Sequence, residues 1–566
     1  DPRCGILCPT PKRWPGRLQA ALLAILALTA FGPSLSGGFI WDDDAHFEHN
    51  PAVQDPRGLV AIWTTGAAGY YPLVLTIFWA MRRIVGLWPP AYHLLNILMH
   101  AAVMILLWRT LRRLNVPGAW LGAACFGVHP LQVESVAWVT ELKNTQSGVF
   151  TLLALLLFLR YDEQRAAPGS RRWLAAAMGA HALAVLSKTS TVMLPVIALM
   201  CLWWRGSGAG RRAWLGETAP LFAISALGAL LTVWVQTTVH GVQGEEYTQS
   251  LPERCLNAGW IAGFYALKNL WPVPLMFIYP RWEVDPMRAA HWAPSLAVAG
   301  LVLALWLARR HAWGRAAFMT AACYLILLFP VMWFLNTYFT RYSYVGDHFQ
   351  YLPGMALWAG FGAALWQGAG TIACKWTTPA RRWAVQWIAG AATLGTLAGA
   401  SFAYAPVFHD NERLWRDTLR KNPRAWMAHL NLAILLTKTH RPDEAMPHYR
   451  EALKERPGHA NAQAAYAEAL AAAGQLDEAA AHYEAAVRID PRLARAWASL
   501  AAIRGAQGRP SQAAELARRA LDCDPNLVEA HENLAVALQA LGQSDQSSKH
   551  RERARQLRAR MSPALP

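Results

Sequence analysis

The sequence predicts an all-α protein in which a polytopic bundle of membrane helices precedes an α-solenoid of short helical repeats. Two observations carry this prediction. Hydrophobic residues make up 54% of the 566 residues and charged residues only 16%, and the long apolar runs end near residue 403. Beyond that point Ala, Glu, Arg and Gln become frequent, and small residues return with a fixed period. A chain of this length is expected to hold more than one domain.

The apolar runs predict about eleven membrane spans. Each is long enough to cross a bilayer, provided that some are tilted or partly buried. A signal peptide could also begin with such a run, but no convincing cleavage pattern follows the first one, so we interpret it as a retained span. The expected spans lie at 18–36, 91–108, 118–134, 146–160, 173–187, 189–204, 214–236, 292–308, 316–334, 352–369 and 383–403.

Basic clusters between the spans predict their orientation. With eleven spans all six clusters fall on one side, which the positive-inside rule makes cytoplasmic. The C-terminal repeats are then outside the cytoplasm: in the periplasm of a bacterial inner membrane, or in the lumen if the membrane is the endoplasmic reticulum. The clusters are Lys12/Arg13/Arg17, Arg109/Arg112/Arg113, Arg160/Arg165/Arg171/Arg172, Arg205/Arg211/Arg212, Arg309/Arg310/Arg315 and Lys375/Arg381/Arg382.

Two further apolar segments do not fit this alternation of charge. Residues 72–90 carry Arg82 and Arg83, and residues 255–282 carry Lys268 and three prolines. We expect both segments to lie at the outer interface as amphipathic or re-entrant pieces.

Charge and cysteine usage exclude other classes. The net charge of +17 would suit nucleic acid, but the Arg and Lys residues sit between apolar runs, so no nucleic-acid partner is expected. The eight cysteines lack metal-ligand spacing, and the Cys4-x3-Cys8 pair is a weak candidate for a metal.

Three consecutive carboxylates, Asp42, Asp43 and Asp44, follow the first span in the stretch GGFIWDDD at 37–44. Carboxylates are costly in lipid and cheap in water. The stretch is therefore either a solvated loop that stops the helix from sliding, or a source of a base for a reaction at the membrane surface.

Unusual polar residues gather in the other outer loops as well. Five cations there run against the positive-inside bias. Each alone could be an interfacial snorkel or the partner of a nearby carboxylate, but together they suggest an anionic ligand such as a lipid-linked phosphate. His129 and His348 are either substrate-orienting or ordinary interfacial histidines. The five cations are Lys143, Lys188, Lys268, Arg281 and Arg341, and the loop carboxylates are Glu134, Glu141 and Asp347.

The C-terminal part repeats every 34 residues. Small Ala lets one helix pack closely on the next, and Pro ends the second helix of each unit. This period is the signature of tetratricopeptide repeats, with units at 424–457, 458–491, 492–525 and 526–559. The periodic positions are Pro423, Pro457, Pro491 and Pro525; Gly474, Gly508 and Gly542; and Ala433, Ala467, Ala501 and Ala535.

These boundaries predict the domain organisation. A membrane domain at 1–406 is followed by a connecting helix at 407–423, the repeats at 424–559 and a tail at 560–566. The first unit departs from the pattern because His440 takes the place of the usual Gly. Such an array is expected to bind a protein or peptide in its concave groove, or another part of its own chain.

The combination of acidic loop, polytopic core and repeats resembles a known family. The Asp pair after the first span, the H-P-x3-E-S-V-A element from His129 and the repeats look like the transmembrane and tetratricopeptide repeat-containing O-mannosyltransferases and their bacterial relatives, which are GT-C class membrane glycosyltransferases. The resemblance implies a polyprenyl-phosphate sugar donor, such as a mannose donor, and a hydroxyl acceptor such as protein Ser or Thr. It makes this an O-mannosylation-like protein glycosylation enzyme.

The resemblance also suggests roles for the residues of the outer loops. The family's acidic motif maps onto Asp42 and Asp43, with Asp44 as an extra carboxylate, and one of them would be the base on the acceptor hydroxyl. From their side of the membrane we assign the donor phosphate to Lys143, Lys188, Lys268 and Arg341. Glu134 and Glu141 are assigned to sugar hydroxyls or to these cations, and His129, Arg281, Asp347 and His348 complete the substrate-binding set.

The chemistry of a lipid-phosphate donor fits this set. Lipid phosphate is a competent leaving group, so the reaction mainly needs a base and cations. Three carboxylates could also hold a divalent cation, Mg²⁺ or Mn²⁺. Two alternatives stay open. One is a non-catalytic membrane scaffold that assembles envelope or secretory proteins, and the other, less favoured, is a transporter or flippase of a lipid-linked sugar.

Overall fold

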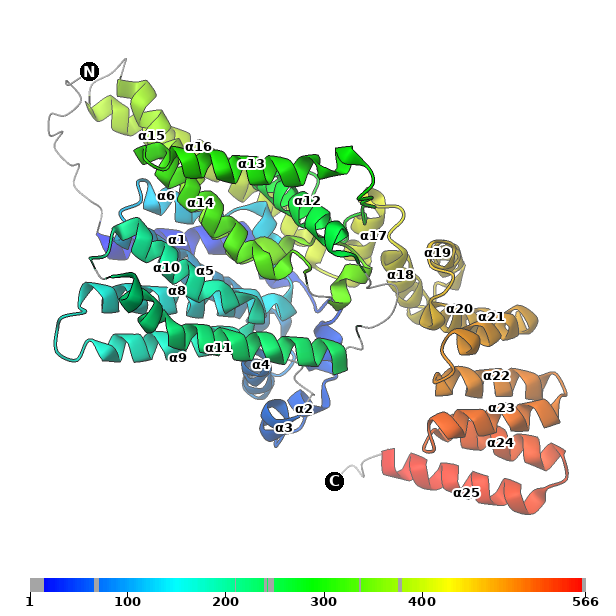
Figure 1. The fold of residues 1–566 in the computed structure, drawn as a ribbon. Helices are drawn as coiled ribbons and strands as arrows, with labels where there is room; N and C mark the ends of the chain where they lie inside the picture. Colours follow the sequence, from blue (N-terminus) through cyan, green and yellow to red (C-terminus); the bar gives the residue numbers. More distant parts are fainter. Residues whose placement is uncertain are drawn as a thin grey trace. The chain divides into compact units, whose positions relative to one another are not determined.

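The computed structural model of the protein describes residues 15–65, 71–208, 210–238, 242, 249–334, 337–374 and 379–561. Cys4, Cys8, Lys12, Arg13, Lys375 and positions 562–566 of the expected tail lie outside these residues. The described residues form helices and connecting loops without any β-strand, which confirms the all-α prediction (Figure 1). The chain divides into two compact units, Asp1–Leu414 and Trp415–Pro566.

Seven of the described helical segments are long and apolar enough to cross a membrane by length and composition. The first is α1 (Gly16–Phe31), extended by the 3-10 turn η2 (Gly32–Ser36). They make the protein a multi-pass integral membrane protein. The other six are built on α5 (Pro89–Arg113), α8 (Leu142–Glu163), α11 (Arg211–Thr238), α13 (Ala293–Ala308), α14 (Ala312–Leu328) and α16 (Pro379–Tyr404). Together with neighbouring short turns, the segments of α8, α13, α14 and α16 run Val139–Glu163, Ala289–Ala308, Ala312–Val331 and Trp383–Phe408.

Three of the remaining expected spans correspond to helices that are shorter or less apolar: α9 (Arg171–Ser187), α10 (Leu194–Arg205) and α15 (Tyr351–Cys374). The expected count of eleven crossings, and the orientation that follows from it, stay predictions.

The expected span at 118–134 is wrong as a single crossing helix. Helix α6 (Ala119–Gly127) has nine residues, which rise about 14 Å. The helix ends because Pro130 disfavours a helical conformation at His129 before it. The chain then continues as short turns, η5 (Pro130–Gln132), α7 (Val133–Ala137) and η6 (Val139–Glu141), before α8 begins.

The two segments predicted at the interface are only partly helical. In the first, α4 (Pro72–Val85) bonds to the first loop through Arg82 and Arg83, whose guanidinium groups donate to the carbonyls of Glu48 and Val53. That loop holds the π-helical turn η3 (Asp44–Glu48), α2 (Pro51–Gln54) and α3 (Leu59–Thr64). In the second, α12 (Leu251–Leu270) is followed by an irregular stretch as far as the short turn η9 (Ala289–Trp292).

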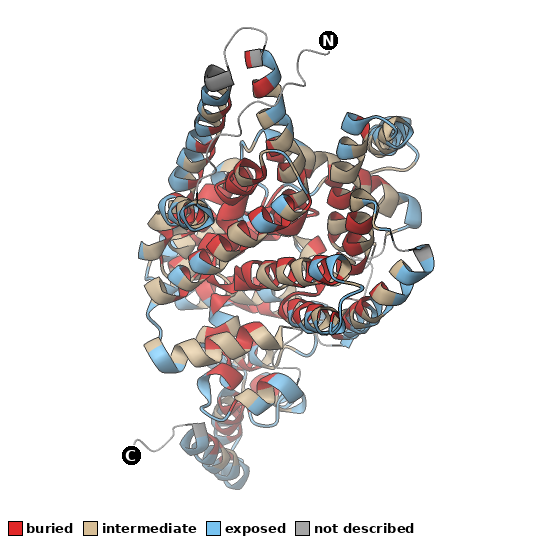
Figure 2. Ribbon diagram, turned by 90° about the vertical axis from the view of Figure 1, so that its left-hand side faces the viewer, coloured by how far each residue is buried: buried red, intermediate tan, exposed pale blue. Residues whose placement is uncertain are grey.

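The centre of the membrane unit is built on α5 and α8, the two most buried of the seven candidate spans. Buried residues concentrate on the inner helices (Figure 2). Helix α13 has no buried residue. Helices α6 and α15 approach closely at glycines, since a Cβ on Gly362 would lie 2.4 Å from Cα of Gly122. A helix without buried residues suits contact with lipid, whereas α5 and α8 form the packed support for the loops.

Short turns at the ends of these helices come together in space. The loop after α6 contacts the turn before α15, η12 (Asp347–Gln350), and α9 leads through Lys188 into η7 (Thr189–Met193). A further turn, η11 (Tyr338–Arg341), precedes η12. Most of the polar residues singled out by the sequence lie on these turns.

The second unit contains four antiparallel helix pairs, as the repeats predict. His440 occupies the glycine slot of the first pair and adopts φ 59°, beside φ 78° at Gly474 and 72° at Gly508. The pairs follow α17 (Asn411–Lys421) and are α18 (Trp426–Lys438) with α19 (Pro442–Glu455), α20 (Ala460–Ala472) with α21 (Leu476–Ile489), α22 (Ala494–Ala506) with α23 (Pro510–Cys523), and α24 (Val528–Ala540) with α25 (Ser544–Met561).

Candidate active site

The acidic triplet after the first span contains three different environments. Asp43 is fully buried, and both carboxylate oxygens accept hydrogen bonds: Oδ2 from the Ile40 amide at 2.9 Å, and Oδ1 from the Thr140 amide at 2.8 Å and the Thr140 hydroxyl. Burial, and then the charge of Asp42, raise the pKa of Asp43 to about 7. Asp43 therefore joins the first loop to the turn before α8.

Asp42 and Asp44 are accessible to different degrees. The Asp42 side chain is 25% exposed, and its Oδ2 lies 3.5 Å from Nδ1 of His46, while its Oδ1 is buried without a hydrogen-bond partner among the described residues. The Asp44 side chain is 59% exposed and contacts His49. Asp42 is the one carboxylate of the triplet that is both sheltered and reachable.

Glu141 is the centre of a buried charged cluster. Its carboxylate lies 2.7 Å from Nζ of Lys143 and 3.4 Å from Nζ of Lys188, and it also accepts a hydrogen bond from the side-chain amide of Asn144. Lys188 donates to Oδ1 of Asn144 at 2.6 Å. Burial lowers the pKa of Lys188 to about 8, against the raising effect of Glu141. Two cations thus share the buried carboxylate of Glu141.

Glu134 and His348 form a second buried pair beside this cluster. Glu134 accepts from Nδ1 of His348 at 2.7 Å and from the His348 amide at 3.1 Å. The side-chain amide of Asn144 donates to the His348 backbone carbonyl at 3.0 Å, which links the Glu134–His348 pair to the Glu141 cluster.

Trp138 connects the charged cluster to the acidic loop. Its ring lies 5.5 Å from Nζ of Lys143, 5.9 Å from the His348 ring and 6.0 Å from the Trp41 ring, which precedes Asp42. The indole N–H of Trp138 is buried without a partner among the described residues. The acidic loop, Lys143 and His348 are therefore connected through Trp138.

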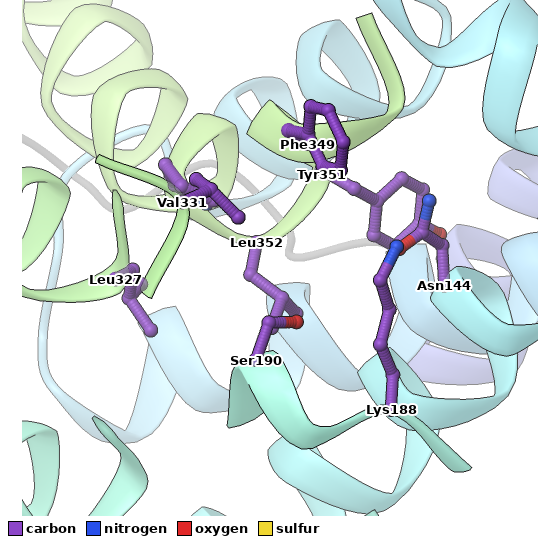
Figure 3. A pocket seen from close by; sticks show the side chains of 9 residues that line it. Asn144, Lys188, Ser190, Leu327, Val331, Phe349, Tyr351 and Leu352 are labelled. Carbon is purple, nitrogen blue, oxygen red and sulfur yellow. The ribbon is translucent and has the colours of Figure 1, made fainter. Parts of the chain in front are cut away.

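A small pocket opens beside Lys188 (Figure 3). Lys188 and Asn144 lie at one end of it, and Leu327 and Val331 lie at the other. Its remaining lining residues are Ser190, Phe349, Tyr351, Leu352 and Pro353. The pocket therefore combines a buried cation with an apolar wall.

The other predicted residues lie apart from this cluster or are occupied by protein contacts. Both ring nitrogens of His129 bond to backbone, one to the Leu131 amide and one to the Asn269 carbonyl. Lys268 donates to the Pro274 carbonyl at 2.6 Å, and Arg281 is exposed and donates to the Tyr344 hydroxyl at 2.9 Å.

Arg341 and Asp347 have aromatic neighbours. The Arg341 guanidinium lies 5.1 Å from the Tyr338 ring, and Asp347 is buried and accepts from the Tyr279 hydroxyl at 2.8 Å. Asp347 fixes the turn that carries His348, and the Arg341 guanidinium packs over the rings of Tyr338 and Tyr342.

A group that could hold a divalent cation lies on the first loop. Asp44, Glu48 and His49 each offer one ligand atom, and these atoms lie within 4.8 Å of one another. Two carboxylates and an imidazole suit Mn²⁺ better than Mg²⁺, which prefers oxygen ligands. Only Asp44 of this group belongs to the acidic triplet that could hold a divalent cation, so a cation at the triplet stays a prediction.

Three residues of this region were not singled out as site residues. Thr140 and Asn144 lie beside the predicted site residues Glu141 and Lys143, but nothing in the sequence distinguishes their neutral side chains from ordinary polar residues. His46 follows Asp42 by four residues, a spacing that brings side chains together on a helical turn and could have been noticed.

Comparison with known families identifies the second unit. Three family models described as tetratricopeptide repeat match residues 408–460, 436–503 and 516–547. Among solved structures, the crystal structure of MamA matches with a TM-score of 0.25 and 17% identity, over 26% of this chain and 88% of that chain.

Curated relatives match a quarter to a third of the chain. Protein O-mannosyl-transferase TMTC2 of Mus musculus is 29% identical over 153 residues, which is 25% of this chain and 18% of the relative. Protein O-mannosyl-transferase TMTC1 of Homo sapiens is 30% identical over 166 residues, which is 27% of this chain and 19% of the relative. The chain is similar to the TMTC O-mannosyl-transferases. TMTC3 of Mus musculus matches 33% of this chain at 25% identity, and the matched part spans only about a fifth (21%) of that relative's length.

Proposed function

We propose that the protein is a membrane glycosyltransferase that moves a sugar, such as mannose, from a polyprenyl-phosphate donor to a hydroxyl acceptor on the extracytoplasmic side. The observation that carries the proposal is the pocket with Lys188 and Asn144 at one end and apolar side chains at the other. A lipid phosphate has the same division, because its phosphate needs cations and its tail needs apolar surface.

The electrostatics of the pocket support a phosphate as the ligand. Lys143 and Lys188 both lie beside the carboxylate of Glu141, so an incoming anion meets two ammonium groups that are already ordered. Ordered cations stabilise the charge that develops on a leaving phosphate, and they do so best where water is excluded. Lys268 and Arg341 stay second candidates for the donor phosphate, since each is held by other contacts.

The acidic loop supplies the base function in this proposal. Among the three aspartates we assign it to Asp42, because Asp43 is occupied by three donors and Asp44 is largely exposed. The names of the relatives support mannose as the sugar and a protein oxygen as the acceptor, which we propose to be the hydroxyl of Ser or Thr. Tetratricopeptide repeats bind peptides or proteins, and we propose that they recruit the acceptor.

Transfer by the purified full-length protein in lipid tests the proposal. The protein is given radiolabelled polyprenyl-phosphate sugars, and wild type is compared with Asp42→Asn. Removal of a general base should lower the transfer rate by about 10²- to 10⁴-fold, with donor binding retained. Absence of transfer from wild type with every donor tested, or full transfer by Asp42→Asn, would contradict it. The first outcome would favour the non-catalytic scaffold.

A further inference from the structure

His348 lies beside the polar end of the Lys188 pocket. Its backbone carbonyl accepts a hydrogen bond at 3.0 Å from the side-chain amide of Asn144, whose Oδ1 accepts from Nζ of Lys188 at 2.6 Å. Asn144, Lys188 and the neighbouring Phe349 all line the pocket, and Nζ of Lys188 lies 5.8 Å from the centroid of the Phe349 ring. His348 is therefore joined to the proposed phosphate end of the pocket through the side chain of Asn144.

One ring nitrogen of His348 is fixed by Glu134, and the other is left for a ligand. Nδ1 lies 2.7 Å from Oε1 of Glu134, and the His348 amide donates to Oε2 at 3.1 Å. An ionised carboxylate can only accept, so Nδ1 carries a proton and donates it. Nε2 has no hydrogen-bond partner among the described residues, and the side chain is only 6% exposed. A sheltered polar nitrogen without a partner is costly, unless a ligand completes its hydrogen bonds.

The turn that carries His348 is held on both sides by tyrosine hydroxyl groups. The Tyr265 hydroxyl donates to the Gly346 carbonyl at 2.8 Å and accepts from the Gly346 amide at 2.9 Å. The Tyr279 hydroxyl donates to the carboxylate of Asp347 at 2.8 Å. Recognition of a small ligand needs side chains that their neighbours hold in one position. The ring of His348 meets that requirement before any ligand arrives.

His348 also contacts the aromatic residues that lead to the acidic loop. Its ring lies 5.9 Å from the Trp138 ring, which lies 6.0 Å from the ring of Trp41, the residue before Asp42. In the proposed transfer the anomeric carbon lies between the phosphate oxygen that leaves and the acceptor oxygen that faces the base. These two ends are assigned to Lys188 and Asp42, and His348 belongs to the contacts that connect them. The sugar is therefore the part of the donor that would reach its ring.

We propose that Nε2 of His348 binds one hydroxyl group of the donor sugar and that Glu134 positions the ring for this contact. The inference rests on the transfer function proposed above and names the residue that recognises the sugar. A sugar hydroxyl both donates and accepts hydrogen bonds, so it suits Nε2 with or without a proton. His129 does not fit this role, because both of its ring nitrogens bond to the backbone.

Donors that lack single hydroxyl groups test the contact. Polyprenyl-phosphate mannose is compared with analogues in which hydrogen replaces the hydroxyl at carbon 2, 3, 4 or 6. One analogue should lower kcat/KM of the wild-type protein by about 10- to 100-fold, because a sheltered group then loses its partner. His348→Asn keeps an N–H for Glu134 but lacks Nε2. It should lose a similar factor with the mannose donor and nothing further with that analogue, whereas the other analogues should behave alike in both proteins.

Two further variants separate recognition of the sugar from support of the fold. Glu134→Gln keeps an oxygen that accepts from Nδ1 of His348 but removes the charge, so it should weaken the contribution of the same hydroxyl and of no other. His100→Asn is the matched control, because both ring nitrogens of His100 bond within the protein, to the Tyr351 hydroxyl and the Gly127 carbonyl. Any activity that it loses should be lost equally with every donor. The wild-type profile and Glu134→Gln still test the contact if His348→Asn does not fold.

Two results would overturn the inference and leave the proposed function intact. In the first, the wild-type protein uses all four analogues as well as the mannose donor. In the second, His348→Asn either keeps the wild-type rate or loses the same factor with every donor, so that His348 supports the fold and binds no hydroxyl. If the wild-type protein transfers no sugar from any donor, the proposed function fails first. The two failures are therefore distinguishable in the same set of assays.

Discussion

Lys188 is a buried cation whose charge depends on pH in an accessible range. Burial lowers its pKa to about 8, so it is mostly protonated at pH 7 and loses its charge as the pH rises through about 8. Its amino group touches Asn144 and Glu141 and lines the pocket. The charge available to a phosphate in the pocket should therefore fall over that interval.

We predict that donor affinity decreases as the pH rises through about 8. A polyprenyl-phosphate sugar is a phosphodiester, so its own charge does not change there. Lys188→Arg should remove the decrease, because arginine stays protonated. Lys188→Gln should weaken binding at pH 7 by about 1.5–3 kcal/mol, the value of a charge-assisted hydrogen bond. Donor binding to the purified protein, measured between pH 6.5 and 9.5, checks both. An unchanged profile in Lys188→Arg would place the phosphate elsewhere.

At the same scale, the sequence could indicate the residue types of the site but not their individual roles. The sequence alone does not distinguish Asp42, Asp43 and Asp44. In the fold Asp43 is buried and bonded to Thr140, whereas the side chain of Asp42 stays partly exposed to solvent. The same limit applies to Glu141, because its two lysine partners include Lys188, which is 47 positions away. Contacts between residues far apart in the chain leave no periodic signal in a single sequence.

At the scale of the helices, prediction succeeded where a pattern persisted over many residues. The 34-residue period predicted the helix pairs, and His440 adopts the left-handed conformation of the glycines that it replaces. The apolar run at 118–134 was misleading because hydrophobicity alone does not show where a helix stops. Pro130 was visible in that run and ends the helix.

The repeats contain two matched histidine pairs that link the helices of the first and last units. Nδ1 of His429 lies 2.9 Å from Nδ1 of His448, and Nε2 of His429 donates to the Pro423 carbonyl. His531 and His550 repeat both contacts with Pro525. In the second repeat Gln463 takes the place of the first histidine, and its side-chain oxygen accepts a hydrogen bond from Nδ1 of His482 at 2.6 Å.

Acid should lower the stability of the first and last tetratricopeptide repeats more than that of the second repeat. Burial lowers the pKa of His448 and His550, and also that of His482 in the second repeat, where Glu478 opposes it. Only His448 and His550 face a second histidine, whose charge lowers their pKa further, with Arg416 and Arg518 acting in the same direction and Glu444 opposing at His448. The unfolded state then binds more protons, so stability is lost as the pH falls below about 6.5, the ordinary histidine pKa. Two protonated histidines would also present N–H groups to each other.

The test gives the first and last repeats the glutamine that the second repeat has at this position. His429→Gln with His531→Gln should keep both hydrogen bonds and recover about 2 kcal/mol of stability at pH 5, at about 1 kcal/mol for each bond. Hydrogen exchange of repeat peptides in the full-length protein, corrected for the pH dependence of the intrinsic rates, measures this at pH 5 and 7.5. Equal acid sensitivity of wild type and the double variant would show that the pairs do not control it.

At the scale of the whole molecule, the two compact units divide the proposed work. Every residue of the candidate site lies within Asp1–Leu414, and the repeats within Trp415–Pro566 have their own buried clusters. If the repeats only recruit the acceptor, the chemistry should not need them. A scaffold would have the opposite dependence, since its function would lie in the repeats and would tolerate Asp42→Asn.

Truncation after Asn422 separates these two possibilities. We predict that the truncated protein transfers sugar to a short Ser- or Thr-containing peptide at a rate within about threefold of the full chain, because contacts at the reacting centre are unchanged. Transfer to a folded protein acceptor should fall by about 10²-fold, the gain that a second, tethered binding site supplies through effective concentration. Equal losses for both acceptors would mean that the repeats support the membrane unit itself, and equal retention would mean that they recruit something other than the acceptor.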